Sequence, residues 1–362
     1  METNFGQTSA YTVGVEEEFQ LIDPTSHALI PAIDAVVAAR ETTGLPPDSI
    51  ASELSASCVE ARSPIYGAVA DLAKELPVLR RRVGDLAEGC GARLAAGGTH
   101  PFSESTEQEI TAKERYRRVE EEMGWTARMQ SIYGLHVHVA VPDEERAIRA
   151  VAALTRHVPL FVALSANSPY WAGRDTRLAS VRVKIFNLVP RSGLPPRFRS
   201  WEDFEGYVEA LVRAGSIPDY SLCWWDVRPH PRLGTVELRA PDMQTDPIRT
   251  ASLTALAQCL VATAEEHAPE DSLYIEENKW RAARHGLDAN LHDFSTGRSA
   301  TVRDSARHLV EQLHPISQDL RCEAELEGLL DILHEGSGAD RQRAVFEKRG
   351  SIKAVAGYLA TT

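Results

Sequence analysis

The fold is decided by Tyr11-Thr12-Val13-Gly14-Val15-Glu16-Glu17-Glu18-Phe19-Gln20-Leu21-Ile22-Asp23, close to the start of the chain. Apolar and polar residues alternate from Val13 to Phe19, and successive side chains of a strand point to opposite faces. The stretch is therefore predicted to be a β-strand that ends at Asp23-Pro24. Glu16 and Glu18 share one face of it, where two neighbouring carboxylates can aim at a common cation.

Three further strand-like stretches carry an acid or an imidazole on one face and apolar residues on the other. They are Ser57–Pro64 with Glu60 beside Arg62, Gln130–Val141 with His136 and His138, and Thr235–Ala240 with Glu237 beside Arg239. Carboxylate ligands favour Mg²⁺ or Mn²⁺, whereas Zn²⁺ would want more His or Cys than this set supplies. If the four strands meet in one sheet, their side chains form a divalent-metal site.

Each stretch by itself also has an ordinary structural interpretation. Glu16 and Glu18 could belong to a solvated edge strand, and Glu60 with Arg62 could be a surface ion pair. His136 and His138 could be one hydrogen-bonded and one exposed histidine, and Glu237 with Arg239 a salt bridge within the sheet. Only the convergence of all four stretches distinguishes a site from these alternatives.

The order of elements predicts an α+β fold with a mainly antiparallel sheet. Strands are separated by helical patterns, but they do not repeat in the β-α-β rhythm of a doubly wound sheet. The helices are expected at 144–166 after Pro142-Asp143, at 68–94 with an interruption near Pro77, at 302–313 and at 317–334. With no internal repeat or long linker, residues 1–362 are interpreted as one domain.

Composition excludes several classes of protein. The chain has 362 residues, of which 43% are hydrophobic and 25% charged, as is usual for soluble globular proteins. No long uncharged apolar run or export signal is visible, so we expect no membrane and a cytoplasmic location. The net charge of -13 makes nucleic acid an unexpected partner, and five cysteines without a Cys-x-x-Cys pair suggest reduced thiols.

Familiar nucleotide-binding motifs are missing. The sequence contains neither G-x-x-x-x-G-K-[ST] nor a G-x-G-x-x-G fingerprint, so an ATP site would have to be of another kind. Phosphoryl transfer to a carboxylate is the chemistry that needs such a metal cluster, because a carboxylate is a poor electrophile until it becomes an acyl phosphate. With six Lys against 33 Arg, arginine is the expected partner of the phosphates.

Several motifs, taken in order, carry a resemblance to a known family. They are Gly14–Phe19, Gly98–Phe102, Gly134–Val139, Ser165–Pro169, Trp225–Pro229 and Gly234–Arg239, followed by Asn278–Leu287. Together they resemble the carboxylate-amine ligases of the YbdK kind, which are related to glutamate-cysteine ligase type 2. The resemblance runs from about residue 11 to 290 and leaves 295–362 as a C-terminal helical part.

The resemblance implies a fold distantly similar to that of glutamine synthetase, with a curved antiparallel sheet forming a funnel and helices outside. It implies ATP with Mg²⁺ (or Mn²⁺) at one end of the funnel and an amino-acid substrate near the other. The expected activity is that of an ATP-dependent carboxylate-amine ligase that acts on small molecules, with weak glutamate-cysteine ligase activity to be tested. Its assembly as a homodimer is left open.

The resemblance also suggests residue roles. The implied metal ligands are Glu16, Glu18, Glu53, Glu60, His136 and Glu237. Glu53 lies seven residues before Glu60 and cannot share one strand face with it without a bulge or bend. Arg239 resembles a nucleotide-phosphate contact. The implied catalytic residues are Glu16, Glu18, Glu60, Glu237 and Arg239. The implied substrate-pocket residues are Arg62, Arg177, Arg182, Trp225 and Arg228. His138 is expected to support the ligands rather than bind metal.

Three rival functions remain open from the sequence. A metal-dependent hydrolase would use His136 and His138 to activate water and would need no ATP. A guanidino kinase-like phosphotransferase would use the same nucleotide site but hand the phosphoryl group to nitrogen. A binding protein that keeps the fold without turnover would be expected to lose some of its mutually repelling carboxylates.

Overall fold

A twisted antiparallel sheet of seven strands organises the chain. The computed structural model describes residues 1–41, 43–264 and 271–360. The strands follow the order β10-β11-β5-β1-β3-β2, with β4 added to β1, and every pairing among them is antiparallel. Their bounds are β1 Val13–Ile22, β2 Ile50–Ser52, β3 Cys58–Arg62, β4 Arg93–Ala95, β5 Leu135–Ala140, β10 Val227–His230 and β11 Thr235–Leu238.

Helices and short strand pairs complete the fold. The helices are α1 Ile33–Arg40, α2 Val69–Gly89, α3 Glu114–Met123, α4 Trp125–Arg128, α5 Glu144–Ser165, α6 Arg182–Phe186, α7 Trp201–Arg213, α8 Pro247–Ala262, α9 Ser272–His285, α10 Val302–Asp319, α11 Glu323–Glu335, α12 Gly338–Arg349 and α13 Ile352–Leu359. The short strands are β6 Tyr170–Trp171, β7 Arg174–Asp175, β8 Ser192–Gly193, β9 Trp224–Trp225, β12 Asn290–Asp293 and β13 Arg298–Thr301.

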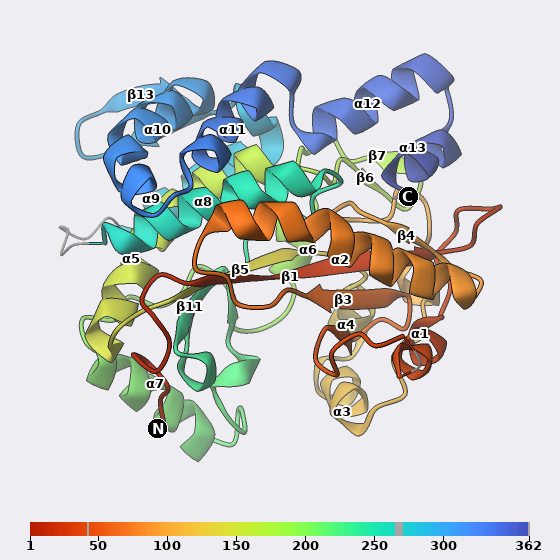
Figure 1. Cartoon of the computed structure of the whole chain (residues 1–362), viewed down its shortest axis with the longest axis horizontal. Coiled ribbons are helices and arrows are strands. Elements are labelled where there is room, and N and C mark those ends of the chain that lie inside the picture. The colour runs from red at the N-terminus through yellow and green to blue at the C-terminus, as the bar shows by residue number, and fades with distance from the viewer. Residues whose placement is uncertain (42, 265–270, 361–362) are drawn as a thin grey trace.

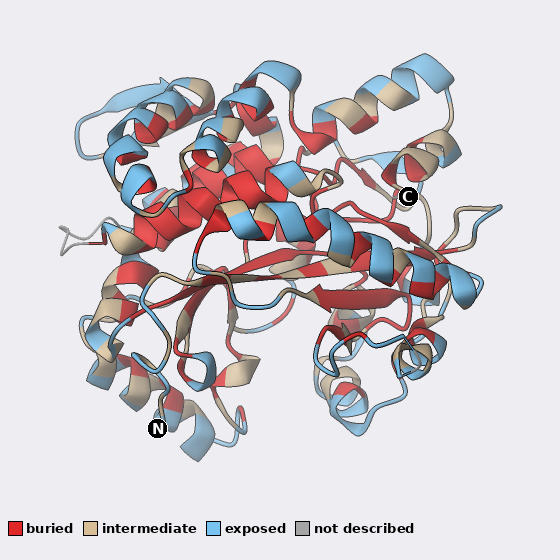
Figure 2. Ribbon diagram, in the orientation of Figure 1, coloured by how far each residue is buried: buried red, intermediate tan, exposed pale blue. Residues whose placement is uncertain are grey.

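One face of the sheet is covered by helices and forms the core. In Figure 1, α2 and α8 lie along one side of β1 and β3, and Figure 2 shows α8 buried along most of its length. The apolar side chains of β1, β5 and β11 pack there with residues of α2, α5 and α8 in one hydrophobic cluster. The alternation read from the sequence thus places the valines against helices.

The opposite face of the sheet is polar and curved. Figure 1 shows β11 turned away from the plane of β1 and β3, with α7 and α3 on either side of the space below. Across the strands, Glu16 is paired with His136 and Arg62, Glu18 with Glu60, and Glu237 with His138. The prediction of an α+β fold with a curved, mainly antiparallel sheet is confirmed.

Two helix predictions were wrong. Helix α2 is not interrupted near Pro77 but runs unbroken from Val69 to Gly89. The predicted break between 313 and 317 is also absent, because α10 continues through Pro315 to Asp319 and the chain turns only at Arg321, whose φ is 54°. A proline removes one backbone donor and adds a local clash. Apolar residues of α2 are buried on both sides of Pro77, and after Pro315 the partly buried Ile316 and Leu320 pack against the core, so packing maintains both helices.

Helix α5 is the one helix of the described residues that is long and apolar enough to cross a membrane. In the fold, 72% of its most apolar window is buried against the sheet and neighbouring helices, so it is a core helix. Its N-terminus follows the sequence signal, since the carboxylate of Asp143 accepts a hydrogen bond from the backbone N–H of Arg146.

The C-terminal helices pack onto the same core. Residues of α10 and α11 belong to the hydrophobic cluster that holds the sheet against α8, and Ala360 pairs with Ala95 of β4.

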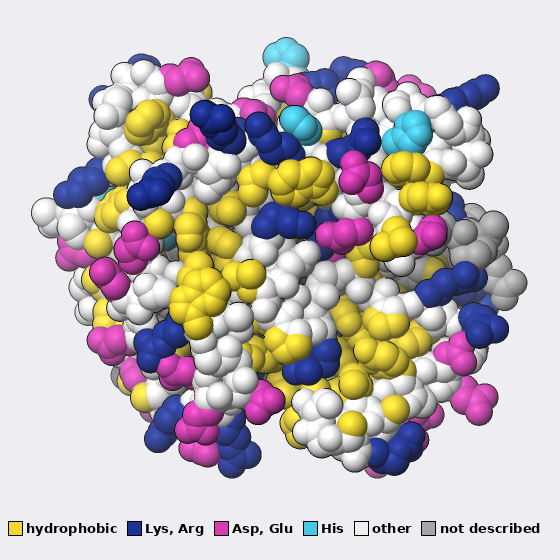
Figure 3. Space-filling model, turned by 180° about the vertical axis from the view of Figure 1, so that it is seen from behind, with side chains coloured by type: hydrophobic (Ala, Val, Ile, Leu, Met, Phe, Trp, Pro, Cys, Tyr) yellow, Lys and Arg dark blue, Asp and Glu magenta, His cyan; other side chains and the backbone are white. Residues whose placement is uncertain are grey.

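On the face seen in Figure 3, basic and acidic side chains are interspersed. The one-domain interpretation, the cytoplasmic location and the lack of a nucleic-acid partner stay predictions.

A buried carboxylate of the sheet forms an ion pair with one helix and a hydrogen bond with another. Glu17, on the helix-covered face of β1, receives hydrogen bonds from Arg80 of α2 at 2.5 and 2.9 Å and from Thr250 of α8 at 2.7 Å. Arg80 also donates to the backbone carbonyls of Gln244 and Thr245. Breaking a buried pair from one side leaves a charge without a partner, which costs far more than replacing both partners by apolar groups.

We predict that Arg80→Met lowers the free energy of unfolding by about 3 to 5 kcal/mol, because the carboxylate of Glu17 is left unpaired in the core. Urea unfolding followed by circular dichroism measures this loss. The double variant Glu17→Leu/Arg80→Met should recover much of it. Arg81→Met, on the exposed side of the same helix, is the matched control, and equal stability of the Arg80 and Arg81 variants would contradict the assignment.

Candidate active site

A cavity of about 1280 Å³ lies on the polar face of the sheet. Eleven of the thirteen residues singled out from the sequence line it, His138 among them: Glu16, Glu18, Glu53, Glu60, Arg62, His136, His138, Arg182, Arg228, Glu237 and Arg239. From this floor the cavity extends to α3 on one side and to residues 215–224 on the other. Side chains from distant parts of the chain therefore meet around one space.

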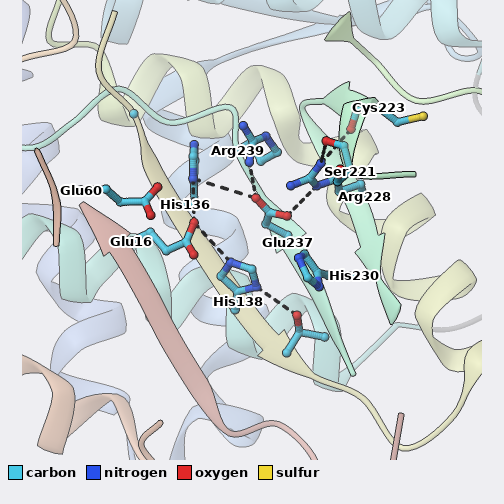
Figure 4. A network of polar contacts seen from close by, with 12 residues as sticks. Glu16, Glu60, His136, His138, Ser221, Cys223, Arg228, His230, Glu237 and Arg239 are labelled. Carbon is cyan, nitrogen blue, oxygen red and sulfur yellow. Dashed lines mark hydrogen bonds and ion pairs between the residues drawn. The ribbon is translucent and has the colours of Figure 1, made fainter. Parts of the chain in front are cut away.

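Glu16 stands at the centre of this polar cluster (Figure 4). Its Oε2 lies 3.1 Å from Nδ1 of His136 and 3.7 Å from Nε2 of His138, the two histidines that project from one face of β5. His136 also approaches Glu18, with 3.7 Å between Nε2 and Oε1, and Glu237, with 3.9 Å between Nδ1 and Oε1. The prediction that both imidazoles share the face of the acids is confirmed.

Two overlapping groups of side chains have the geometry of cation ligands. Glu16, Glu60 and His136 form one, and Glu16, His138 and Glu237 form the other, with ligand atoms within 4.8 Å of one another in each group. Carboxylate oxygens with a single imidazole suit Mg²⁺ or Mn²⁺. The second group places His138 among possible ligands, beyond the supporting role expected from the sequence.

Burial and crowding raise the pKa of three carboxyl groups in the cavity. Burial, followed by the charges of Glu60 and Glu18, raises the pKa of Glu53 well above its ordinary value. Burial and the charge of Glu16 raise the pKa of Glu60 to about 7. Burial likewise raises the pKa of Glu18, against the opposing charge of Arg182 and a hydrogen bond from the backbone N–H of Gly134. A divalent cation would remove this penalty, so the donor set fits such an ion.

Two other carboxylates are held in the charged form. Burial opposes the ionisation of Glu16, but its contacts with His136 and His138 outweigh burial and hold its pKa well below the ordinary value. Burial also opposes the ionisation of Glu237, and there the charges of Arg228 and Arg239 prevail and lower the pKa strongly. The cluster therefore combines carboxylates that ionise easily with carboxylates that resist losing a proton.

Arginines on the same strands balance the acids. Arg228 Nε donates to Glu237 at 2.6 Å, and its Nη1 is fixed by the carbonyls of Ser221 and Cys223 at 2.9 and 3.1 Å. Arg239 pairs with the other oxygen of Glu237. Arg62 donates to Glu60 at 2.7 Å and, with a side chain that is 42% exposed, reaches toward the open cavity. These guanidinium groups can contact phosphate or carboxylate groups of a ligand.

Arg182 differs from these arginines because it makes no ion pair, although the charges of Asp242 and Glu18 act on it. Among the described residues, no carboxylate lies within ion-pair distance of it, and its Nη atoms donate to the carbonyls of Ala240 and Arg239 at 3.1 and 3.3 Å. The side chain is 2% exposed, and its Nε has no hydrogen-bond partner in the structure. A Cβ at Gly134 would overlap its guanidinium, which explains a glycine at the start of β5.

Glu53 reaches the cavity despite its distance from Glu60 in the sequence. Strand β2 turns back antiparallel on β3, and Ala51 is the register partner of Glu60. Glu53 follows Ala51 by two positions and so faces the same side. A turn between two strands therefore resolves the objection that one strand could not carry both residues.

Two predicted pocket residues lie elsewhere. Arg177 is exposed in the loop between β7 and α6, with φ of 59°, and is absent from the cavity lining. Trp225 is 2% exposed and packs in an aromatic cluster with Phe198 and Tyr207. Side chains alternate along β9, so its neighbour Trp224 faces the cavity instead.

The sequence interpretation missed several cavity residues. His230 follows Arg228 by two positions on β10 and lines the cavity, so the same period-two argument could have found it. Trp224 lies beside Arg191, whose guanidinium carbon is 5.8 Å from the indole ring centroid. Arg191 and Ile217 come from irregular segments for which no periodic signal exists.

Comparison with known proteins places the chain among ligases. The model of the family described as glutamate-cysteine ligase family 2 (GCS2) matches residues 12–357. A Rubrobacter xylanophilus protein named "Putative glutamate--cysteine ligase 2-3" is 66% identical over 360 residues, which are 99% of each chain. A similarly named Thermobifida fusca protein is 37% identical over 370 residues, covering 99% of this chain and 92% of that one.

Solved structures share the fold at low sequence identity. The crystal structure of a glutamate-cysteine ligase from Francisella tularensis in complex with AMP has a TM-score of 0.70 and 13% identity, covering 97% of this chain and 88% of that one. A bifunctional glutathione synthetase from Pasteurella multocida has a TM-score of 0.66 and 14% identity, covering 97% of this chain and 51% of the other. At these identities the likeness shows the fold alone.

We predict that Glu60→Gln weakens Mn²⁺ binding by about tenfold or more while leaving the metal-free protein at least as stable as the wild type. The amide removes a ligand oxygen's charge, but it also removes repulsion among Glu53, Glu16 and Glu60. Titration calorimetry measures the affinity, and urea unfolding without metal measures the stability. Glu209→Gln, an exposed change on α7, is the control; wild-type Mn²⁺ affinity in Glu60→Gln would remove Glu60 from the ligand set.

Proposed function

The chain belongs to the glutamate-cysteine ligase family 2, and we propose that it joins a small carboxylic acid to an amine in an ATP-dependent reaction that proceeds through an acyl phosphate. One observation carries the proposal. Five carboxylates, His136 and three arginines face a single cavity, and they come from five strands, from residues next to strands and from one helix. Such a set combines cation ligands with phosphate partners.

The proposed reaction has two steps. A substrate carboxylate oxygen attacks the γ-phosphorus of ATP, the bond from that phosphorus to the bridging oxygen breaks, and ADP leaves. The amine nitrogen then attacks the acyl carbon, phosphate leaves with the former carboxylate oxygen, and the nitrogen loses a proton to solvent or phosphate. The products are an amide, ADP and phosphate, and no nucleophile from the protein is needed.

The acids and His136 suit the role of metal ligands in this reaction. Glu16, Glu18, Glu53, Glu60, His136 and Glu237 would hold Mg²⁺ or Mn²⁺, with His138 within reach. When bound, the divalent ion supplies charge neutralisation between the phosphates and the attacking carboxylate. Mutual repulsion among Glu53, Glu60 and Glu18 supports this role, since a cation is what would make their joint ionisation favourable.

The arginines would bind and orient the anionic groups. Arg228 and Arg239 are both anchored by Glu237 on the floor of the cavity, so their positions are set before a ligand arrives. Arg182 is buried and its Nε has no hydrogen-bond partner in the structure, which favours contact with a phosphate or substrate carboxylate. The side chain of Arg62 is the most exposed of these four arginines and is suited to a group nearer the cavity mouth.

The volume of the cavity, about 1280 Å³, supports two substrates. The strand floor lies between α3, with Arg115 and Tyr116, and the segment that contains Ile217 and Trp224. A nucleotide at one end and an amino acid at the other would both reach the floor. The names of the relatives make glutamate and cysteine the first pair to test.

We predict that ADP and phosphate are released in a one-to-one ratio with a new amide only when ATP, Mg²⁺, an acid and an amine are all present. A screen of amino-acid pairs, beginning with glutamate and cysteine, measures ADP by a coupled assay and the amide by mass spectrometry. Amide or ester hydrolysis without nucleotide would instead support the metal-dependent hydrolase, and a stable phosphoguanidine would support the phosphotransferase.

We predict that Arg239→Ala raises the KM for ATP or lowers kcat by about 10- to 100-fold, because a charged hydrogen bond to phosphate is lost from a desolvated position. Steady-state kinetics at saturating acid and amine measure the effect. Arg213→Ala, an exposed arginine of α7 paired only with Glu209, is the control. Unchanged KM and kcat would remove Arg239 from the nucleotide contacts.

A further inference from the structure

A buried ion pair lies behind the cavity and touches none of the proposed metal ligands. Lys279 of α9 is fully buried, and its Nζ donates to Oδ2 of Asp226 at 2.6 Å; the Asp226 side chain is 2% exposed. Neither residue lines the cavity. Among the described residues, the other acid that forms an ion pair with Lys279 is Glu276, at 3.8 Å and with a side chain that is 38% exposed.

Asp226 occupies the junction that presents the cavity arginines. It is the single residue between β9 and β10, and Arg228 follows it by two positions. Its carbonyl accepts a hydrogen bond from the backbone N–H of Arg239 at 2.7 Å, and its own N–H donates to the carbonyl of Gly193 at 2.7 Å. The placement of Arg239 and Arg228 is therefore tied directly to the backbone of Asp226.

Arg182 depends on the same junction. Its Nη2 donates to the carbonyl of Arg239, the residue that Asp226 holds. Three cavity arginines are thus linked to one backbone segment, and the Lys279 side chain joins that segment to helix α9.

Stability alone does not explain an ion pair at this place. Two charges removed from water cost about as much as they return, and apolar residues of similar volume are often as stable or more so. An ion pair is directional, however, because it requires Asp226 Oδ2 and Lys279 Nζ to stay at hydrogen-bond distance. Such a contact can fix the backbone of the junction more narrowly than apolar packing.

We propose that Asp226 and Lys279 form a positioning pair that holds Arg228, Arg239 and Arg182 in register with the cavity floor. The inference rests on the proposed ligase function and adds two residues that contact neither substrate nor metal. Both residues come from sequence motifs, Trp225–Pro229 and Asn278–Leu287, that the cavity lining only partly explains.

The test compares single and double variants of the full chain. Lys279→Met and Asp226→Asn each break the pair, and Asp226→Val/Lys279→Met replaces it by an apolar one. Arg281→Ala is the matched control, because Arg281 lies on the same helix and pairs at the surface with Glu277. Each protein is assayed for urea unfolding, Mn²⁺ affinity, Mg²⁺-ATP affinity by calorimetry, and ADP release with the best amino-acid pair.

Both single variants should lower ADP release by about tenfold or more and weaken Mg²⁺-ATP binding, with Mn²⁺ affinity unchanged. The double variant should regain the wild-type unfolding midpoint without regaining turnover. This separation of stability from activity is what a purely structural pair would not show.

Recovery of both stability and turnover in the double variant would overturn the positioning role. Wild-type turnover in Lys279→Met or in Asp226→Asn would also overturn it. Asp226→Asn keeps the shape of the side chain, so this variant decides the question if the other variants do not fold. If the wild-type protein neither binds Mg²⁺-ATP nor releases ADP, the proposed ligase function is refuted. If the wild type and the double variant are equally active, only the positioning role is refuted.

Discussion

Repulsion among buried carboxylates is the constraint on which the site depends. Glu16, Glu18, Glu53, Glu60 and Glu237 face one cavity, where burial alone already disfavours their charged forms. The fold maintains this arrangement by two means. Arginines from the same strands pair with Glu60 and Glu237, and histidines of β5 contact Glu16. The remaining penalty falls on Glu53, Glu60 and Glu18 and is the strongest physical argument for a bound cation.

A protein can hold such a cluster only if the rest of the fold is stable enough to offset it. The opposite face of the same sheet provides that stability, through apolar packing against α2, α5 and α8. The Glu17–Arg80 pair adds a specific connection between β1 and these helices. Three consecutive glutamates in β1 therefore serve two different purposes, since Glu17 faces the core while Glu16 and Glu18 face the cavity.

The arginines of the cavity are held by the acids and by backbone carbonyls. Arg228 and Arg239 are anchored by Glu237, and the buried Arg182 donates to the carbonyls of Ala240 and Arg239. The backbone N–H of Arg239 also donates to the carbonyl of Asp226 at the junction of β9 and β10, where the Asp226 side chain meets Lys279. In the proposed site the acids and the arginines therefore share one residue, because Glu237 is a proposed metal ligand and also anchors Arg228 and Arg239.

The sequence by itself determined which residues share a strand face, because the alternation of side chains is a local property of the chain. That sufficed for Glu16, Glu18, Glu60, His136 and Glu237, and the same rule extends to His230. The continuity of α2 through Pro77, the exposure of Arg177 and the choice of Trp224 over Trp225 depended on packing between distant segments, which a local pattern does not contain. Only the tertiary structure decided that β2 folds back to bring Glu53 beside Glu60, and that Lys279 meets Asp226, since pairing between remote segments is fixed by the burial of the whole core.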